Sequence, residues 1–191
     1  MAFISLSAAV LAGGKAERMS KQDKGLLFFQ GEPMASSVAR ALQQVADVVF
    51  INANRNIEKY AELGYDVIAD EQNYHGKGPL SGLMSCLAFS KTSHLLVSPC
   101  DTPQISADAF AKLKQASVSS PDRIHYLCDS SGIHPLHAIL PVAETLVALE
   151  AFFNTENRYS VMAFYDYFGG DTVKWDVPEQ LLNVNTPQDL L

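Results

Sequence analysis

The chain has 191 residues, about the length of one domain, of which 48% are apolar and 18% charged. This composition can fill a hydrophobic core and is unlike that of a disordered chain. The net charge of −7 disfavours nucleic-acid binding, since a phosphate backbone requires a basic protein surface. No apolar run approaches the roughly 18 residues that cross a membrane, and no basic residue precedes the first apolar stretch. We therefore expect residues 1–191 to form a single cytoplasmic domain without a secretory signal.

The cysteine pattern agrees with this expectation. Cys86, Cys100 and Cys128 are odd in number and widely spaced, with no Cys-x-x-Cys pair among them. This spacing favours buried thiols over a disulfide framework or a zinc site.

Short apolar runs alternate with helical patterns along the first two thirds of the chain. We expect strands at 7–12, 47–51, 66–69 and 94–98, and helices at 34–43, 57–63, 79–89 and about 106–115. This alternation predicts βαβ units and a mainly parallel sheet, with right-handed crossovers that place helices on both faces. The expected fold class is α/β, a Rossmann-like three-layer sandwich.

Beyond Pro121 the pattern is less regular. Strands are expected at 123–128, 135–140 and 172–175, and a helix at 143–153, so that the sheet becomes partly mixed. His134 and His137 lie three apart on one of these strands, which predicts opposite faces and roles in turns or packing rather than in metal binding.

Polar residues follow four of the expected strands. Gly13-Gly14, Asn52, Asp70 and Asp101 stand at or just after these strand ends. In open parallel sheets the carboxyl ends of the strands form the ligand-binding edge, so these side chains should converge.

A cluster of basic residues follows the first glycine pair: Lys15, Arg18, Lys21 and Lys24. On an acidic protein this cluster favours a small anionic ligand, although a solvated charged loop would give the same pattern. Together with the polar strand ends, it predicts a nucleotide site.

The glycines match neither the Walker loop nor Gly-x-Gly-x-x-Gly. A second cluster, Gly76, Gly78 and Gly82, opens the helix expected at 79–89. Its N–H groups could bond a nucleobase, but by itself it is more typical of a structural turn.

Several motifs together resemble a known family. They are Leu11-Ala12-Gly13-Gly14, Arg18-Met19, Asp23-Lys24-Gly25, Asn52-Ala53-Asn54-Arg55, Gly78-Pro79-Leu80-Ser81-Gly82, Pro99-Cys100-Asp101-Thr102-Pro103 and Asn183-Val184-Asn185-Thr186-Pro187. The first motif is shared by many nucleotidyltransferases. The ordered set, which covers nearly the whole chain, resembles the molybdenum cofactor guanylyltransferases.

The resemblance implies transfer of GMP from GTP to the phosphate of molybdopterin, with release of pyrophosphate. It implies that Leu11, Ala12 and Gly13 contact GTP together with Gly14 and Gly78, and that Asn52 and Asp70 belong to the guanosine pocket. Lys24 and Arg18 would offset phosphate charge, and Asp101 would bind GTP through Mg²⁺. It also implies transient contact with molybdenum enzymes or their chaperones.

Other assignments remain open. Related cytidylyltransferases usually have Leu-Ala-Ala-Gly, so the smaller Gly13 suggests room for a purine. A sugar-1-phosphate nucleotidyltransferase and a non-catalytic GTP-binding module are the alternatives. Asn183 and Asn185, two apart and therefore on one face of a strand, could serve the acceptor or the metal. Capping of a terminal helix by Thr186 would explain the same segment equally well.

Overall fold

The computed structural model describes residues 3–14 and 22–190. Within these residues one seven-stranded sheet has the order β5-β4-β1-β6-β8-β7-β9. Its strands are β1 (Leu6–Leu11), β4 (Val48–Asn52), β5 (Asp66–Ile68), β6 (His94–Pro99), β7 (Ile124–Asp129), β8 (Gly132–Pro141) and β9 (Gly170–Lys174). β8 is antiparallel to both of its neighbours, whereas the other neighbouring strands of this sheet are parallel. The predicted mainly parallel, partly mixed sheet is confirmed.

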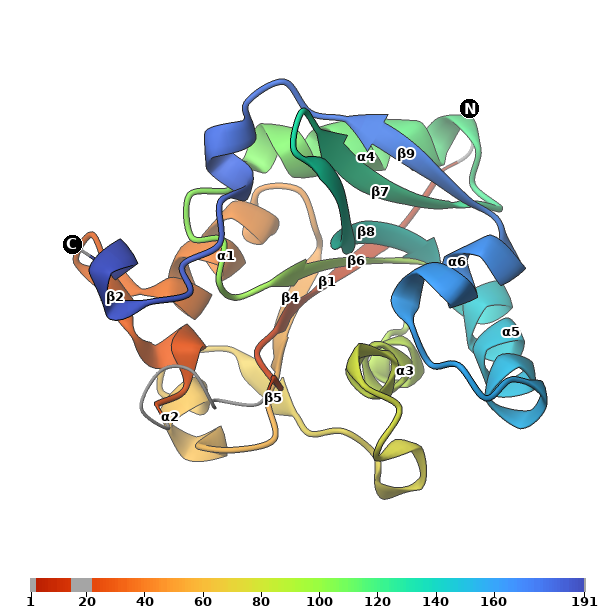
Figure 1. The fold of residues 1–191 in the computed structure, drawn as a ribbon, viewed down its shortest axis with the longest axis horizontal. Helices are drawn as coiled ribbons and strands as arrows, with labels where there is room; N and C mark the ends of the chain where they lie inside the picture. The colour runs from red at the N-terminus through yellow and green to blue at the C-terminus, as the bar shows by residue number, and fades with distance from the viewer. Residues whose placement is uncertain (1–2, 15–21, 191) are drawn as a thin grey trace.

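Helices cover both faces of the sheet (Figure 1). On one face lie α1 (Met34–Gln43), α2 (Ile57–Ala61) and α4 (Ala107–Ser119), whose buried residues form one hydrophobic cluster with the sheet. On the other lie α3 (Pro79–Phe89), α5 (Val142–Thr155) and α6 (Val161–Phe168), which share a second cluster. The predicted three-layer arrangement is therefore confirmed.

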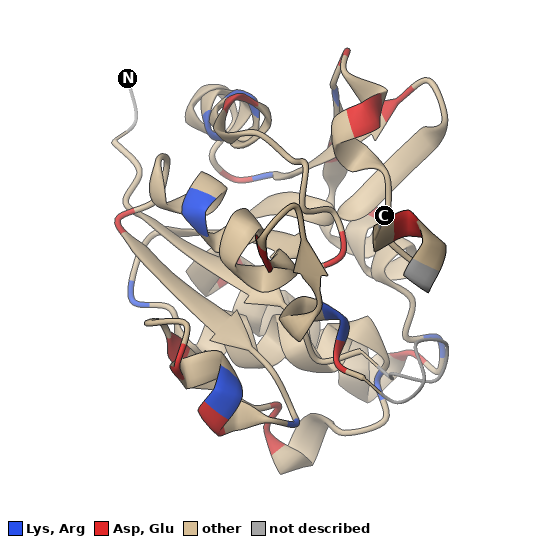
Figure 2. Ribbon diagram, turned by 90° about the vertical axis from the view of Figure 1, so that its left-hand side faces the viewer, with Lys and Arg blue, Asp and Glu red and all other residues tan. Residues whose placement is uncertain are grey.

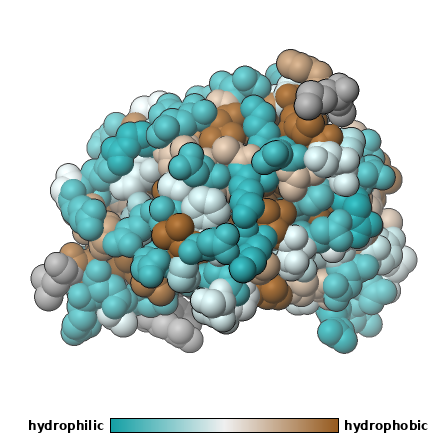
Figure 3. Space-filling view, turned by 90° about the horizontal axis from the view of Figure 1, so that it is seen from above, coloured by the Kyte–Doolittle hydropathy of each residue, from teal (hydrophilic) through white to brown (hydrophobic). Residues whose placement is uncertain are grey.

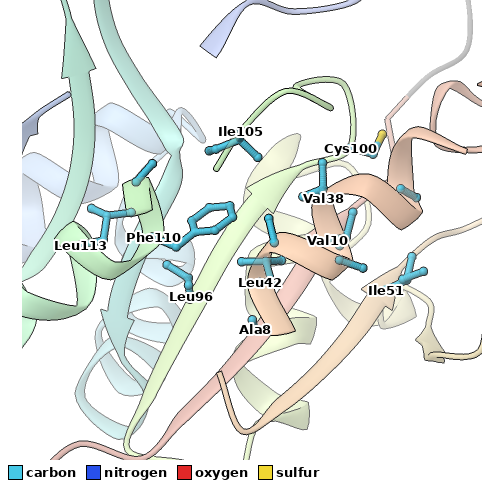
Figure 4. Packing of buried hydrophobic residues seen from close by; sticks show 14 of the residues in the cluster. Ala8, Val10, Val38, Leu42, Ile51, Leu96, Cys100, Ile105, Phe110 and Leu113 are labelled. Atoms are coloured by element: carbon cyan, nitrogen blue, oxygen red, sulfur yellow. The ribbon is translucent and has the colours of Figure 1, made fainter. Parts of the chain in front are cut away.

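The first cluster fixes the strands that carry the candidate site. Val38 and Leu42 of α1 and Phe110 of α4 pack over Val10 of β1 and Leu96 of β6 (Figure 4), and none of the five is exposed. Burying each of these side chains contributes about 1.5–3 kcal/mol. This packing holds β1 and β6 in place and so fixes the positions of their carboxyl ends.

Several elements differ from the sequence prediction. The hairpin of β2 (Phe28–Phe29) and β3 (Glu32–Pro33) and the helix α6 were not expected, and α4 and β8 are longer than predicted. Four 3₁₀ turns complete the described chain: η1 (Lys24–Leu26), η2 (Gln72–Tyr74), η3 (Pro178–Leu181) and η4 (Pro187–Leu190). α6 begins after Ser160, whose hydroxyl accepts from the Ala163 N–H at 3.0 Å as an N-cap.

The two histidines of β8 correct another prediction. The register between β7 and β8 shifts, so that Tyr126 pairs with Ala138 while Leu127 pairs with His134. This irregularity breaks the two-residue alternation, and the rings of His134 and His137 lie 6.0 Å apart, centroid to centroid, rather than on opposite faces.

Both histidines have structural partners, as their expected packing roles require. His137 Nε2 lies 2.9 Å from Thr102 Oγ1, and burial together with the charge of His134 lowers the pKa of His137 to about 3. His134 lies 3.0 Å from the carboxylate of Asp129. Burial disfavours the ionised form of Asp129, but hydrogen bonds from Ser131 and His134 outweigh it and lower its pKa to about 2.

The surface is mixed in character. Charged residues lie mainly on helices and loops (Figure 2), and on the face shown in Figure 3 hydrophobic residues form separate patches among hydrophilic ones. In the part of the chain that the structure describes, no helix combines the length and apolar character needed to cross a membrane.

Candidate active site

The candidate site lies at the carboxyl edge of the sheet, where the strand order reverses. β1 lies between β4 and β6. After β1, the chain forms β4 and β5 on one side of it and then crosses to form β6 on the other side. Such a switch point leaves a crevice in which α/β proteins bind ligands. A cavity of about 700 Å³ occupies this crevice, a size typical of small-molecule sites.

The cavity brings together the site residues that the sequence analysis proposed. Its lining includes Leu11, Ala12, Gly13, Gly14, Lys24, Asn52, Asp70, Gly78 and Asp101. Arg18, also proposed, lies outside the described residues, as do Lys15 and Lys21. The convergence of distant strand ends, predicted from the polar residues that follow them, is confirmed.

Lys24 and Asp101 meet on one side of the cavity. The Lys24 ammonium lies 3.4 Å from the Asp101 carboxylate and donates to Asn185 Oδ1 at 2.8 Å. The Lys24 and Asp101 side chains are 24% and 19% exposed, so this ion pair is partly shielded from water. Lys24 and Asp101, which both line the cavity, are thus joined to Asn185 of the C-terminal segment.

The 183–186 segment reaches this point without being a strand, which corrects the strand placement of Asn183 and Asn185. It is tied to the loop after β6 by a bond from Val184 N to Asp101 O, at 2.8 Å. Asp189 accepts from the N–H groups of Asn185 and Thr186 at 2.9 and 2.8 Å, which ties the start of η4 back to the segment before it.

Asp101 has no capping role in the following helix. The N-cap of α4 is Ser106, whose hydroxyl accepts from the Ala109 N–H at 3.4 Å. The Asp101 carboxylate is turned to Lys24 instead.

Asn52, Asn54 and Asp70 form a second polar cluster, on the other side of the Gly13-Gly14 turn. Asn52 Nδ2 donates to Asp70 at 2.9 Å, and Asn54 Nδ2 donates to the other oxygen of the same carboxylate at 3.1 Å. Asn54 Oδ1 accepts from the Asp70 N–H at 2.8 Å. Asn52 is buried, so these bonds hold its amide in one orientation.

Two glycines allow this polar group to lie close to the backbone. A Cβ at Gly13 would stand 2.9 Å from Asn54 Nδ2, and a Cβ at Gly82 would stand 2.6 Å from Asn52 Oδ1. Gly14, in contrast, has open space where its Cβ would be. Glycine at position 13 thus leaves room for the side-chain amides of Asn52 and Asn54. The sequence analysis had instead related the small residue to room for a purine.

The segment before α3 forms another wall. Gly78 has φ +59°, a conformation that favours glycine, and it lines the cavity together with His75 and Gly76. Lys77 lies with its ammonium 3.9 Å from the centre of the Tyr159 ring. This cation–π contact ties the wall to the segment between α5 and α6.

The thiols are mostly buried, as expected, and all three cysteines are free. Cys86 and Cys100 are buried, and Cys128 is half-buried. Cys100 lines the cavity, but burial and the nearby Asp101 raise the pKa of its thiol to about 12, so it stays protonated at neutral pH.

Sequence reasoning missed three side chains that structure the site. Asn54 and Arg55 stood in a quoted motif, but no role was assigned to them. Asp23 directly precedes Lys24 and lines the cavity. Each of these side chains bonds to residues distant in sequence. Before the structure, only their presence in the family motifs could have pointed to a role in the site.

The fold and the site together define the class. A three-layer α/β sandwich with a lysine, a carboxylate and a glycine turn at its switch point is typical of nucleotide-binding α/β domains. Residues 8–168 match the family model described as the MobA-like NTP transferase domain. The chain belongs to this family of nucleotidyltransferases.

Relatives and solved structures agree. The chain is 36% identical over 188 residues to the molybdenum cofactor guanylyltransferase of Haemophilus influenzae, covering 98% of this chain and 96% of the relative. It is 35% identical to the protein of that name from Pasteurella multocida, covering 98% of each. The crystal structure of molybdopterin-guanine dinucleotide biosynthesis protein A from Archaeoglobus fulgidus matches with a TM-score of 0.73 at 18% identity, over 96% of this chain and 94% of that one. At this identity the match shows the fold alone.

Proposed function

We propose that this protein transfers GMP from GTP to the terminal phosphate of molybdopterin, giving the guanine dinucleotide and pyrophosphate. The observation that carries the proposal is the meeting of Lys24 and Asp101 in a cavity at the switch point of the sheet, where Asn185 also contacts the Lys24 ammonium. The names of the full-length relatives support the choice of guanine nucleotide and of acceptor.

The reaction needs no nucleophile from the protein. An oxygen of the acceptor phosphate forms a bond to the α-phosphorus of GTP, and the bond from that phosphorus to the bridging oxygen breaks. The electron pair leaves with pyrophosphate. The protein's task is to align two anions and to offset charge on the leaving group.

The described residues suit these tasks. The Lys24 ammonium, held by Asn185 and Asp101, would donate to phosphate oxygens as a point charge. The backbone of Gly13 and Gly14 lines the cavity, and Gly14 leaves open space beside it for a phosphate to approach. Asn52 and Asp70, fixed by their mutual hydrogen bond, would contact the guanosine.

We also propose that Mg²⁺ is required. The Asp101 carboxylate and the Asn185 amide oxygen both contact the same ammonium, and such hard oxygen donors suit Mg²⁺. In the described residues no group of three or more His, Cys, Asp or Glu is placed to hold a metal ion. Mg²⁺ usually takes one or two carboxylates together with waters and phosphate oxygens, so Asp101 fits that demand. When bound, Mg²⁺ supplies charge stabilisation to the triphosphate.

Two further expectations remain predictions. They are cytoplasmic location and transient contact with molybdenum enzymes or their chaperones.

The test is a transfer assay with [α-³²P]GTP, molybdopterin and MgCl₂, using [α-³²P]CTP as the competing substrate. We expect label in the dinucleotide from GTP and one pyrophosphate released for each transfer. Equal transfer from CTP would contradict the guanine specificity, and preferential transfer from CTP would assign a cytidylyltransferase instead. GTP binding without any pyrophosphate release in the presence of acceptor would identify a non-catalytic binding module.

A further inference from the structure

Arg55 bridges two residues of the cavity wall. It follows β4 in the segment that also supplies Asn52 and Asn54. Its Nη2 donates to the carbonyl of Gly14 at 3.0 Å and to Asp23 Oδ1 at 2.7 Å. Gly14 belongs to the turn after β1, whereas Asp23 directly precedes the 3₁₀ turn η1. One guanidinium thus joins the glycine turn to the start of the lysine-bearing turn.

Asp23 is a buried acid in the wall of a cavity proposed to bind a triphosphate. Its side chain is only 5% exposed, and both of its oxygens have partners, Arg55 at one and Asn56 at the other. A buried carboxylate is strongly unfavourable without such partners. An unpaired carboxylate here would also repel phosphate, so the charge of Arg55 offsets that of Asp23.

The position of Asp23 determines that of Lys24. The Asp23 carbonyl accepts from the Leu26 N–H at 3.1 Å and so opens η1. Gly25 of the same turn packs tightly against Tyr60: a Cβ at this position would stand only 2.7 Å from the Tyr60 hydroxyl. This contact fixes the turn on its other side. Lys24, between these two anchored residues, extends to Asp101 and Asn185. Displacement of Asp23 would therefore displace the ammonium.

We propose that Arg55 is a positioning residue for nucleotidyl transfer. It holds Gly14 and Asp23 together, which orients Lys24 toward the phosphates, and it cancels the charge of Asp23 in the cavity wall. This inference rests on the proposed function. It differs from a direct role, in which the half-exposed guanidinium of Arg55 would itself bind a phosphate.

The test combines Arg55→Gln, Arg55→Lys and the double variant Arg55→Gln/Asp23→Asn. We expect Arg55→Gln to raise the KM for GTP about tenfold, because no cation then offsets the charge of Asp23, and to lower kcat about tenfold, because Lys24 is displaced. Removing the unpaired charge in the double variant should return KM to within about threefold of wild type while kcat stays low. Arg55→Lys keeps the charge and should recover KM more fully than kcat.

Arg40→Gln is the matched control. Arg40 likewise pairs with an acid, Glu32, through two bonds, but it lies outside the lining of the cavity at the switch point, so its loss should leave both constants unchanged. Thermal unfolding of every variant without nucleotide checks the fold. If Arg55→Gln fails to fold, the double variant, which leaves no unpaired charge at this position, still tests the kcat prediction.

Two results would overturn the inference. One is kcat and KM of Arg55→Gln within about twofold of wild type. The other is a raised KM that Asp23→Asn does not relieve, which would show that Arg55 binds phosphate directly. Isothermal titration with GTP in the absence of acceptor measures the binding effect separately from turnover. Failure of the wild-type protein to transfer GMP would count against the proposed function, whereas normal transfer by Arg55→Gln would count against this inference alone.

Discussion

Replacing Lys24 by methionine tests the electrostatic role of the cavity wall. Methionine keeps most of the length of the side chain but removes the ammonium that lies 2.8 Å from Asn185 and 3.4 Å from Asp101. A unit charge about 4 Å from a phosphate oxygen is worth about 4 kcal/mol at an effective dielectric constant of about 20. The Lys24 side chain is 24% exposed, so water screens part of this, and we expect a loss of about 3 kcal/mol.

Because 1.36 kcal/mol corresponds to a factor of ten, kcat should fall about a hundredfold. The assay is initial-rate GMP transfer at saturating GTP and Mg²⁺. Lys112→Met is the matched control, since the Lys112 ammonium donates to the Lys174 carbonyl outside the cavity lining. A kcat for Lys24→Met within about threefold of wild type, with the fold intact, would refute the role assigned to this charge.

Three other predictions follow. Asp101→Asn should abolish transfer at every Mg²⁺ concentration while thermal unfolding changes little, and activity retained across a magnesium titration would reject the metal role. Gly13→Ala should lower Tm because its Cβ would stand 2.9 Å from the Asn54 amide, whereas Gly14→Ala, with open space, should not; equal Tm values would contradict this packing. His137 stays neutral in the folded protein down to its pKa of about 3, whereas the unfolded chain takes up a proton below about pH 6.5. The free energy of unfolding should therefore fall by about 2 kcal/mol between pH 8 and pH 5, and urea titrations of His137→Gln should lack this part of the decrease.

The edge of the sheet could be predicted because buried parallel strands leave a strong sequence pattern. Runs such as 7–12 and 94–98 are mostly apolar, and glycine or polar residues follow each within a few positions. Asp101 and Asn52 were placed correctly for this reason. The carboxyl ends of parallel strands share one edge of the sheet, and those proposed GTP-contacting residues that the structure describes do line one cavity there.

Features that depend on contacts distant in sequence could not be predicted. Asn185 contacts Lys24 across 161 residues, and nothing near either residue indicates that pairing. Arg55 and Asp23 likewise show their partnership only in the folded chain. The α6 segment was missed because residues such as Phe164 suit a buried strand as well as a helix, and the N-cap signal at Ser160 was not used.

The histidine prediction failed for a local reason. Strict alternation assigns His134 and His137 to opposite faces, but it assumes a regular strand. The register shift opposite Tyr126 and Leu127 in β7 breaks that regularity and brings the two rings together. A bulge of this kind leaves no consistent mark in a single sequence.

The most direct test of the central claim is a crystal structure of the protein soaked with GTP and Mg²⁺. We predict the triphosphate within hydrogen-bond distance of Lys24, the metal on Asp101, and the guanosine beside Asn52 and Asp70. GTP bound in the groove between α1 and the start of α4, or with its phosphates beyond the reach of Lys24, would contradict the account.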